Sequence, residues 1–439
     1  MLRATIRTLH CTAAVLAFDV ASTATASGRV TLAGGKARLF KNGNPLVFGG
    51  AVKHVEPKHV EAGAVVDVVD GSDKLVGWGV YNPHSMYRVR LLASDEPALL
   101  EHRDLGRLLS HRIAAASMVR TAAGLPSAET TAYRLINGEG DRLSGLMVDI
   151  FDGTAVVISS ALWLERNRDA ISDALLTLPA VSHVEWRRSE ARLKKDGWEE
   201  EEEAAEDERG EANVAAGEPA TEGGDGALRV LENGLQYHVD ILGQKSGFYC
   251  DQRDNRRHLA ELCVGRSVLD LFCYSGGFSL CAGRAGAARC LGVDSSAAAV
   301  ELASQNAALN GLDGVCEFVR ADVMKHLKED APAGGYDVVI CDPPKLAPTV
   351  KDLPRATNRY RKLNGLAMRA VRPGGLLLSC TCSGAMTQSG TFEQTLQDAA
   401  LAQGRALTLL RRSNAACDHT IHPSYPEGQY LTAVLAVVH

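Results

Sequence analysis

In the last quarter of the chain, Asp342 and the three residues after it form a motif that could act on a nucleic-acid base. The motif follows an expected strand at 336–341 and continues with Pro343, Pro344 and Lys345. Because two prolines cannot continue a strand ladder or start a helix freely, they should project the Asp342 carboxylate rigidly from the strand end. A carboxylate there can hydrogen-bond the ring nitrogen and amino group of a base. We therefore expect Asp342 to be catalytic and the three residues after it to bind substrate.

A second motif is an apolar strand, expected over 375–379, that leads through Cys380 to Cys382 and a turn. Carbon 5 of cytosine or uracil becomes nucleophilic only after a group adds to carbon 6, and a thiolate is the natural group to add. Cys382 follows the strand and should lie in a loop, so it is the predicted nucleophile, whereas Cys380 should be structural. Asp342 would stabilise the ring nitrogen during the addition.

Two other readings of these cysteines stay open at this point. Both could simply be small buried residues, as free cysteines often are. A Cys-x-Cys metal site would need two more ligands at matching spacing. The sequence offers no such pair, so no metal is expected.

A cofactor site is indicated by the segment 268–278, which has the pattern of a buried strand, a glycine-rich turn and a helix. Asp270 can anchor the turn or a cationic group, and Gly276 and Gly277 let the backbone approach a ligand closely. The phosphate-binding pattern G-x-G-x-x-G is absent, which disfavours a dinucleotide and suits S-adenosylmethionine. Further contacts expected from the same turn are Phe272, Tyr274 and Ser275.

Two more acids follow expected strands and extend this site. Asp294 lies 24 residues after Asp270, about where a carboxylate would accept both hydroxyl groups of a ribose. Asp322 follows a third strand and is placed to reach the adenine edge. A single acid at a strand end is more often a helix N-cap than a ligand, but three in series favour a cofactor site.

The elements that must position these residues alternate between strand and helix after residue 228. This alternation predicts an α/β fold with a parallel, doubly wound sheet, in which ligands lie at the carboxyl ends of the strands. The expected strands are 267–272, 290–293, 317–320, 336–341 and 375–379, and the expected helices begin at 277 and span 297–309.

The chain before residue 228 has three patterns. Short apolar runs separated by turn residues predict a small β-barrel at 28–95, and 96–198 reads as an α+β region with a helix over 99–123 and a hairpin turning at 152–153. Residues 199–227 are expected to be a disordered acidic insertion. Residues 199–226 have a net charge of −11, whereas the whole chain has a net charge of −6. The rest of the chain therefore carries +5, which is compatible with an RNA partner without requiring one.

The first 27 residues have the basic, acid-poor composition of an organellar transit peptide, so a chloroplast or mitochondrial location is expected, with a cytoplasmic location as the alternative. Ten of the eleven cysteines lie at or after Cys250, which favours a reducing compartment over a disulfide-built secreted protein. No run of eighteen apolar residues occurs, so no membrane span is expected.

Taken together, these motifs make the chain resemble the bacterial-type 23S ribosomal RNA 5-methylcytosine methyltransferases that carry an N-terminal PUA domain. The resemblance covers about residues 28–439 without the acidic insertion. Its motifs are 243–254 (GQKSGFYCDQRD), 270–278, 342–345, 381–384 and 425–428.

The resemblance implies a C-terminal Rossmann-like class I methyltransferase domain at 228–439, a PUA-like RNA-binding barrel and an α+β middle domain. It also implies S-adenosylmethionine as cofactor, large-subunit ribosomal RNA as partner, a dimer, and a cleft to which further residues contribute. Those residues are Lys245 and Tyr249 at the cofactor, Gln252 and Arg253 at the substrate, and Asp251. Gln244 departs from the family, which commonly has His there.

Other functions stay open on the sequence. The target base could be uracil at carbon 5, or guanine. From a different class, the protein could be a ribosome-assembly factor that binds RNA through its barrel without turnover. Basic residues of the barrel that could contact phosphates are Lys53, Lys58, Arg88 and Arg90.

Overall fold

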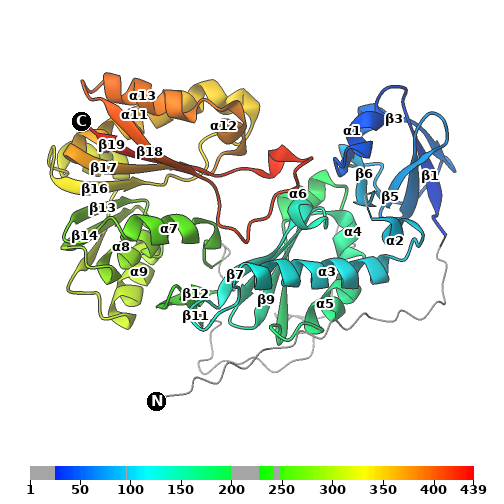
Figure 1. Cartoon of the computed structure of the whole chain (residues 1–439), viewed down its shortest axis with the longest axis horizontal. Coiled ribbons are helices and arrows are strands. Elements are labelled where there is room, and N and C mark those ends of the chain that lie inside the picture. Colours follow the sequence, from blue (N-terminus) through cyan, green and yellow to red (C-terminus); the bar gives the residue numbers. More distant parts are fainter. Residues whose placement is uncertain (1–24, 95, 199–226, 242–246) are drawn as a thin grey trace, which may run out of the picture.

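The computed structural model describes residues 25–94, 96–198, 227–241 and 247–439. Figure 1 shows an N-terminal region in blue, a middle region in cyan and green, and a C-terminal region from green to red. The expected transit peptide falls mainly on 1–24 and the expected acidic insertion on 199–226, both of which lie outside the described residues. None of the described helices is long and apolar enough to cross a membrane.

The C-terminal region is built on a seven-stranded sheet, which confirms the predicted α/β fold. Its strands are β13 (Ser267–Leu271), β14 (Arg289–Asp294), β15 (Cys316–Arg320), β16 (Tyr336–Cys341), β17 (Val371–Thr381), β18 (Leu407–Ser413) and β19 (Thr432–Val438). They are hydrogen-bonded in the order β15-β14-β13-β16-β17-β19-β18. Only β19 runs antiparallel to its neighbours. The strands β14 and β15 lie on one side of β13, and β16 and β17 lie on the other, so the strand order reverses between β13 and β16. Ligands of doubly wound sheets bind at such a point.

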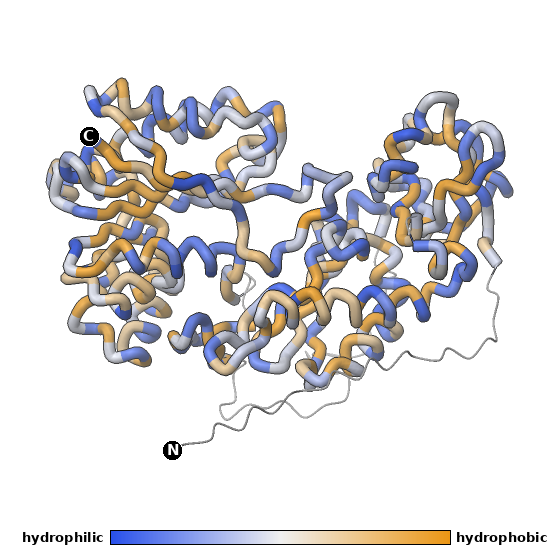
Figure 2. Tube along the Cα trace, viewed as in Figure 1, coloured by the Kyte–Doolittle hydropathy of each residue, from blue (hydrophilic) through white to orange (hydrophobic). Residues whose placement is uncertain are grey.

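Helices cover both faces of this sheet. Alternate residues of one strand enter different cores, because successive side chains of a strand point to opposite faces. Val268 packs in a core with residues of α7, α8 and α9, while its neighbour Leu269 packs with residues of α10, α11 and α13. Figure 2 shows the strands between these helices as a hydrophobic layer. The helices are α7 (Arg253–Ala260), α8 (Gly277–Arg284), α9 (Ala297–Leu309), α10 (Val323–Glu329), α11 (Leu353–Ala370), α12 (Gly384–Ser389) and α13 (Phe392–Leu401).

The middle region combines a four-stranded sheet, ordered β10-β9-β8-β7, with helices. Its strands β8 (Leu146–Phe151) and β9 (Thr154–Ser159) pair in antiparallel register across residues 152–153, which confirms the predicted hairpin. The other elements are α2 (Pro97–Leu100), α3 (Leu105–Ala122), β7 (Ala132–Asn137), α4 (Leu162–Glu165), α5 (Arg168–Leu176), β10 (His183–Arg188) and α6 (Glu190–Lys195).

The N-terminal region is a six-stranded sheet in the order β2-β6-β5-β4-β1-β3, in which only β1 and β4 pair in parallel. One core of valines and leucines fills it, with Phe40 of the short helix α1 (Ala37–Lys41) included. The strands are β1 (Gly28–Leu32), β2 (Leu46–Phe48), β3 (Val52–Glu56), β4 (Val65–Val69), β5 (Leu75–Tyr81) and β6 (Tyr87–Ala93).

Two elements that the sequence did not predict join the regions. The hairpin of β11 (Ala227–Glu232) and β12 (Leu235–Asp240) shares a core with Ala132 and Phe151 of the middle region. The segment 414–431 between β18 and β19, which we call the strap, leaves the large sheet and crosses to the other two regions (Figure 1).

The strap bonds to all three regions. In the middle region, Arg120 donates to the carbonyl of Asp418 (2.6 Å) and Asn137 to that of Thr420 (2.9 Å). In the N-terminal region, Asn44 donates to a strap carbonyl at 3.3 Å. The approach is so close that a Cβ added at Gly140 would lie 2.1 Å from the carbonyl oxygen of Thr420. The three regions are therefore fastened by one segment.

Candidate active site and cofactor site

A cavity of about 1200 Å³ lies at the carboxyl ends of β13, β14, β16 and β17, where they face the strap and the middle region. It brings together most of the residues that the sequence predicted at the site. These are Tyr249, Gln252, Phe272, Tyr274, Ser275, Gly277, Asp294, Asp342, Pro343, Pro344, Lys345 and Cys382.

Four other predicted residues are placed differently. Asp322 caps α10 by accepting the amide of Lys325 at 2.8 Å, and it does not line the cavity. Arg253 is buried and forms an ion pair with Asp418 at 2.8 Å. Asp270 and Gly276 do not line the cavity, and Lys245 and Gln244 lie outside the described residues.

The turn after β13 has an unusual backbone. Phe272 and Tyr274 have positive φ angles of 64° and 49°, a left-handed conformation that costs a residue with a side chain about 1 kcal/mol or more. Asp294, at the end of β14, stabilises it by accepting the amide of Tyr274 at 3.1 Å. The two strand ends are thus joined by the carboxylate that was predicted to bind the ribose.

The glycines of the turn are required by contacts within the protein. Gly276 has φ of 82°, and a Cβ added there would lie 2.8 Å from the ring of Phe318. A Cβ at Gly277 would lie 3.0 Å from the side chain of Arg256. These contacts explain both glycines independently of the ligand approach that we expected.

The acids of the turn fit S-adenosylmethionine. Asp270 is buried, and its Oδ2 accepts the amide and hydroxyl of Ser279 (3.1 and 2.8 Å), while its Oδ1 has no hydrogen-bond partner among the described residues. Burial raises the pKa of Asp270 to about 6, because the charged carboxylate is poorly solvated there. A cationic group near the turn would offset this cost of burying the charge. Asp294 accepts the amides of Tyr274 and Ser296, yet a carboxylate has lone pairs left for ribose hydroxyl groups.

Asp342 is held by a relay of side chains. Ser413 donates to Oδ1 of Asn255 (2.7 Å), and Nδ2 of Asn255 donates to Oε1 of Gln252 (2.7 Å). This orientation turns Nε2 of Gln252 toward Asp342, to which it donates at 3.0 Å. Burial raises the pKa of Asp342 to about 7, with the nearby charge of Asp251 adding to the rise and the hydrogen bond from Gln252 opposing it. A carboxyl group with this pKa can exchange protons near neutral pH.

Cys382 is the first residue beyond β17, in the predicted loop, and it is partly exposed to the cavity. The hydroxyl groups on either side of it fix the loop, because those of Thr381 and Ser383 contact Tyr360 of α11 at 2.7 and 3.3 Å. Ser383 also accepts the amide of Ala347 at 3.0 Å, which ties this loop to the segment that follows Asp342.

The thiol groups of the two neighbouring cysteines have different surroundings. Cys380 lies inside β17 opposite Ala433 and is fully buried. Cys382 is open to the cavity, where burial and the charges of Asp342 and Asp251 raise its pKa to about 12. In the protein alone Cys382 is therefore a thiol, and its reaction requires that its proton be transferred.

Asp251 and Tyr430 form a part of the cavity whose contact the sequence did not reveal. The hydroxyl of Tyr430, at the end of the strap, donates to Oδ2 of Asp251 at 2.8 Å. The two residues are 179 positions apart. Asp251 stands in a recognised motif, but no pattern in the sequence pointed to Tyr430.

Comparison with known proteins identifies the family of the chain. A sequence profile described as S-adenosylmethionine-dependent methyltransferase matches residues 211–415, and one described as PUA-like domain matches residues 30–94. Ribosomal RNA large subunit methyltransferase I of Pseudoalteromonas translucida is 34% identical over 414 residues, which cover 93% of the chain and 99% of that protein. Its counterpart from Alteromonas mediterranea is 36% identical over 415 residues, covering 94% and 99%. The chain belongs to this family.

S-adenosylmethionine is therefore the cofactor of this methyltransferase. A crystal structure of a protein described as a methyltransferase, complexed with SAH, has a TM-score of 0.75 with the chain at 21% identity and covers 93% of the chain. The alignment includes 99% of that structure, so the likeness extends over all three regions of the fold.

The expected organellar location is wrong. The relatives of this methyltransferase are bacterial proteins, and bacteria have no chloroplast or mitochondrion to which a transit peptide would direct them. The comparisons thus favour the cytoplasmic alternative and give no support to a transit peptide at 1–27. The composition of that segment misled the prediction because Arg, Ala and Ser are not specific to targeting sequences.

The basic residues singled out on the N-terminal region differ in what they can reach. Lys53 and Lys58 are exposed. Arg88 donates within its own turn, at 2.7 Å to the carbonyl of Ser85, and Arg90 is buried against Ser144 of the middle region at 2.8 Å. Only the two lysines keep the free, exposed position expected of a phosphate contact.

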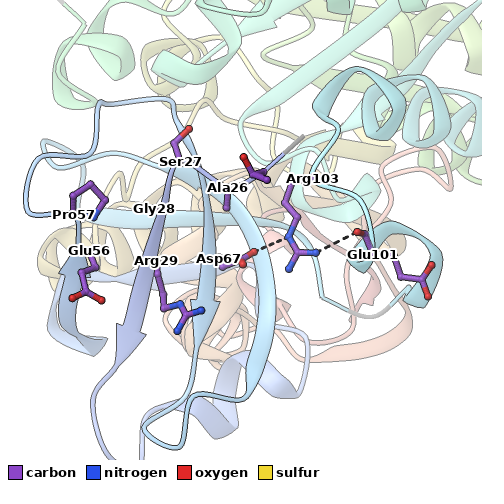
Figure 3. Close-up of a pocket in the computed structure, with 10 residues that line it drawn as sticks. Ala26, Ser27, Gly28, Arg29, Glu56, Pro57, Asp67, Glu101 and Arg103 are labelled. Carbon is purple, nitrogen blue, oxygen red and sulfur yellow. Dashed lines mark hydrogen bonds and ion pairs between the residues drawn. The ribbon is translucent and has the colours of Figure 1, made fainter. Parts of the chain in front are cut away.

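A second hollow, of about 660 Å³, lies where the N-terminal region meets the start of the middle region, and it shares no lining residue with the first. Its walls carry both signs of charge. Its Arg103 is already bound by Asp67 at 2.9 Å and by the carbonyl of Glu101 (Figure 3), and it also donates to the carbonyl of Leu100. We assign it no function.

A buried ion pair supports the cofactor side of the cavity. Arg256 binds both carboxylate oxygens of Glu232 at 2.7 Å and donates to the carbonyl of Tyr249 at 2.8 Å. Its guanidinium group also lies 5.2 Å from the ring centre of Phe248. Since Glu232 belongs to the β11–β12 hairpin, this element positions the cavity wall from behind.

Proposed function

We propose that this methyltransferase transfers a methyl group to carbon 5 of a cytosine in large-subunit ribosomal RNA through a covalent bond between Cys382 and carbon 6. The observation that carries the proposal is the pairing of Cys382 with Asp342, which extend from the adjacent strands β17 and β16 into one cavity. The names of the relatives and the PUA-like profile support the choice of ribosomal RNA.

The pKa values of the pair suggest how the cysteine is activated. In its carboxylate form, Asp342 accepts the proton of the Cys382 thiol, which gives a carboxylic acid and a thiolate. The neutralised acid no longer opposes the thiolate, whose pKa it otherwise raises. When bound, S-adenosylmethionine supplies an electrophilic methyl group on a positively charged sulfur, and that charge also favours a nearby thiolate.

Addition then proceeds with a balanced transfer of protons and electrons. The sulfur of Cys382 adds to carbon 6, and Asp342 donates its proton to the ring nitrogen, which leaves an electron-rich carbon 5. Carbon 5 takes the methyl group. The strap and the middle region line the cavity opposite the strand ends, so the base would enter between Cys382 and the cofactor turn.

The proposal is tested by transfer of labelled methyl groups from S-adenosylmethionine to protein-free large-subunit RNA, followed by nucleoside analysis. We expect labelled 5-methylcytosine with the wild type and none with Cys382→Ala, which should still bind the cofactor. Cys380→Ala is the matched control, two residues away and buried, and should keep activity. Labelled 5-methyluracil or methylguanine, or an active Cys382→Ala variant, would refute the proposal. The dimer implied by the resemblance stays a prediction.

A further inference from the structure

The proposed reaction leaves one proton without an acceptor. After methyl transfer, carbon 5 carries both the methyl group and its original hydrogen, and that hydrogen must leave as a proton before the bond to Cys382 breaks. Asp342 is engaged with the ring nitrogen during the same steps. A second base near Cys382 is therefore required.

Several carboxylates of the cavity are held elsewhere. Asp294 is bound to the amides of the cofactor turn. Asp196 lies 3.5 Å from the guanidinium of Arg90, and Glu139 accepts the hydroxyl of Ser144 at 2.7 Å. These groups stabilise the cofactor turn and the contact between the N-terminal and middle regions.

Asp251 is placed differently, because its charge reaches the reacting pair. The charges of Asp251 and Asp342 both raise the pKa of Cys382, and Asp251 raises that of Asp342 as well. Glu427, also on the cavity wall, instead acts on the phenol of Tyr425. Asp251 lines the same cavity as Cys382, and it is thus the remaining carboxylate acting on the cysteine that the mechanism has not used.

The protein holds Asp251 firmly. It lies in a 3-10 turn, Cys250–Gln252, immediately before α7, and its carbonyl accepts the amide of Ala416 in the strap at 2.8 Å. Tyr430 donates to Oδ2 at 2.8 Å, which fixes the orientation of the carboxylate. Since Gln252, the next residue, binds Asp342 at 3.0 Å, one turn of chain positions both acids.

We propose that Asp251 is the catalytic base that removes the proton from carbon 5, an inference that rests on the proposed function. The Asp251 carboxylate takes the proton, and the electron pair of the carbon–hydrogen bond forms the double bond between carbons 5 and 6. The carbon–sulfur bond breaks, its electron pair returns to Cys382 as a thiolate, and the proton on the ring nitrogen returns to Asp342. Asp251 then releases its proton to water in the cavity.

The test is Asp251→Asn, which keeps the size of the side chain and removes the base. On ordinary RNA this variant should complete addition and methyl transfer and then stop. We expect a denaturation-resistant RNA–protein adduct that contains the labelled methyl group, at least tenfold more abundant than with the wild type, together with loss of turnover.

Two controls separate this role from a structural one. RNA containing 5-fluorocytidine cannot lose the substituent at carbon 5, so it should trap both the wild type and Asp251→Asn; trapping of the variant shows that it folds and binds. Asp254→Asn alters a carboxylate three residues away that accepts the amide of Cys417 at 3.0 Å and does not line the cavity. It should turn over without accumulating the adduct.

The outcomes are distinguishable. If Asp251→Asn turns over at the wild-type rate, or if fluorinated RNA traps it but ordinary RNA does not, another base acts and the inference is wrong. If the wild type is trapped and the variant is trapped by neither RNA, Asp251 acts before addition, which also overturns the inference. If fluorinated RNA does not trap even the wild type, the proposed cysteine mechanism fails, and this inference with it.

Discussion

Gln252→Met should move the pH dependence of methyl transfer, because it removes the hydrogen bond that lowers the pKa of Asp342. The reaction begins when ionised Asp342 accepts the proton of the Cys382 thiol. The rate should therefore rise with pH until Asp342 is ionised and then level off. With the pKa of Asp342 at about 7, the rising limb of kcat/KM should have its midpoint near that pH in the wild type. Below the midpoint, the rate should fall about tenfold for each pH unit.

The size of the shift follows from the energy of that hydrogen bond. A hydrogen bond to a charged group contributes about 1.5–3 kcal/mol, and one pKa unit corresponds to about 1.4 kcal/mol. Although largely buried, Asp342 keeps some exposure to the cavity, so we use the lower figure. The midpoint in Gln252→Met should therefore lie about one pH unit above that of the wild type.

The assay is single-turnover methyl transfer at saturating S-adenosylmethionine and limiting RNA across the range in which the limb rises. Bound S-adenosylmethionine is present with both proteins in this assay, so the difference between their midpoints is the informative quantity. Gln394→Met is the matched control, since it removes a solvent-exposed hydrogen bond of the same kind, 2.9 Å long, from Asp398. A midpoint that stays in place or moves to lower pH in Gln252→Met would refute the role assigned to Asp342.

Three further predictions concern the supports of the site. Asp294→Ala should weaken S-adenosylmethionine binding about tenfold or more, measured by calorimetry, because hydrogen bonds to a charged group are lost; unchanged affinity would exclude the carboxylate from the ribose site. Glu232→Gln should lower the free energy of unfolding by about 3–5 kcal/mol in denaturant titrations, because a guanidinium group is left buried without its partner, whereas the exposed Glu261→Gln should change it little. Gly140→Ala should lower the melting temperature, because its Cβ would overlap a carbonyl of the strap; a Tm equal to that of the wild type would show that the strap can move aside.

Local patterns sufficed to predict the strands and turns that carry the chemistry. The expected strand at 336–341 matches β16 and the expected helix at 297–309 matches α9. The position of Cys382 beyond the end of β17 followed from the change of apolar residues into a turn. These features depend on residues that are close in the chain, so a sequence pattern can show them.

Contacts between distant residues could not be predicted in this way. Tyr430 meets Asp251 only because the strap returns from the middle region, and the burial of Arg253 depends on Asp418 in the same segment. Arg253 was expected at the substrate from the family resemblance, and in the structure its guanidinium group pairs with Asp418 inside the protein. Asp322 was expected at the adenine edge, and in the structure its contacts are those of a helix cap, the other role that the sequence allowed.

Because of the strap, the peptide connection between the middle and C-terminal regions is not what holds these regions together. Because the strap and the β11–β12 hairpin already fasten these regions through space, the bonds at 199–226 are not needed to keep them together. A protease that cut the chain there should leave two fragments that copurify and still methylate as one enzyme. Insertions of varied length and composition at this point would then be tolerated, because the assembly is held by its folded surfaces.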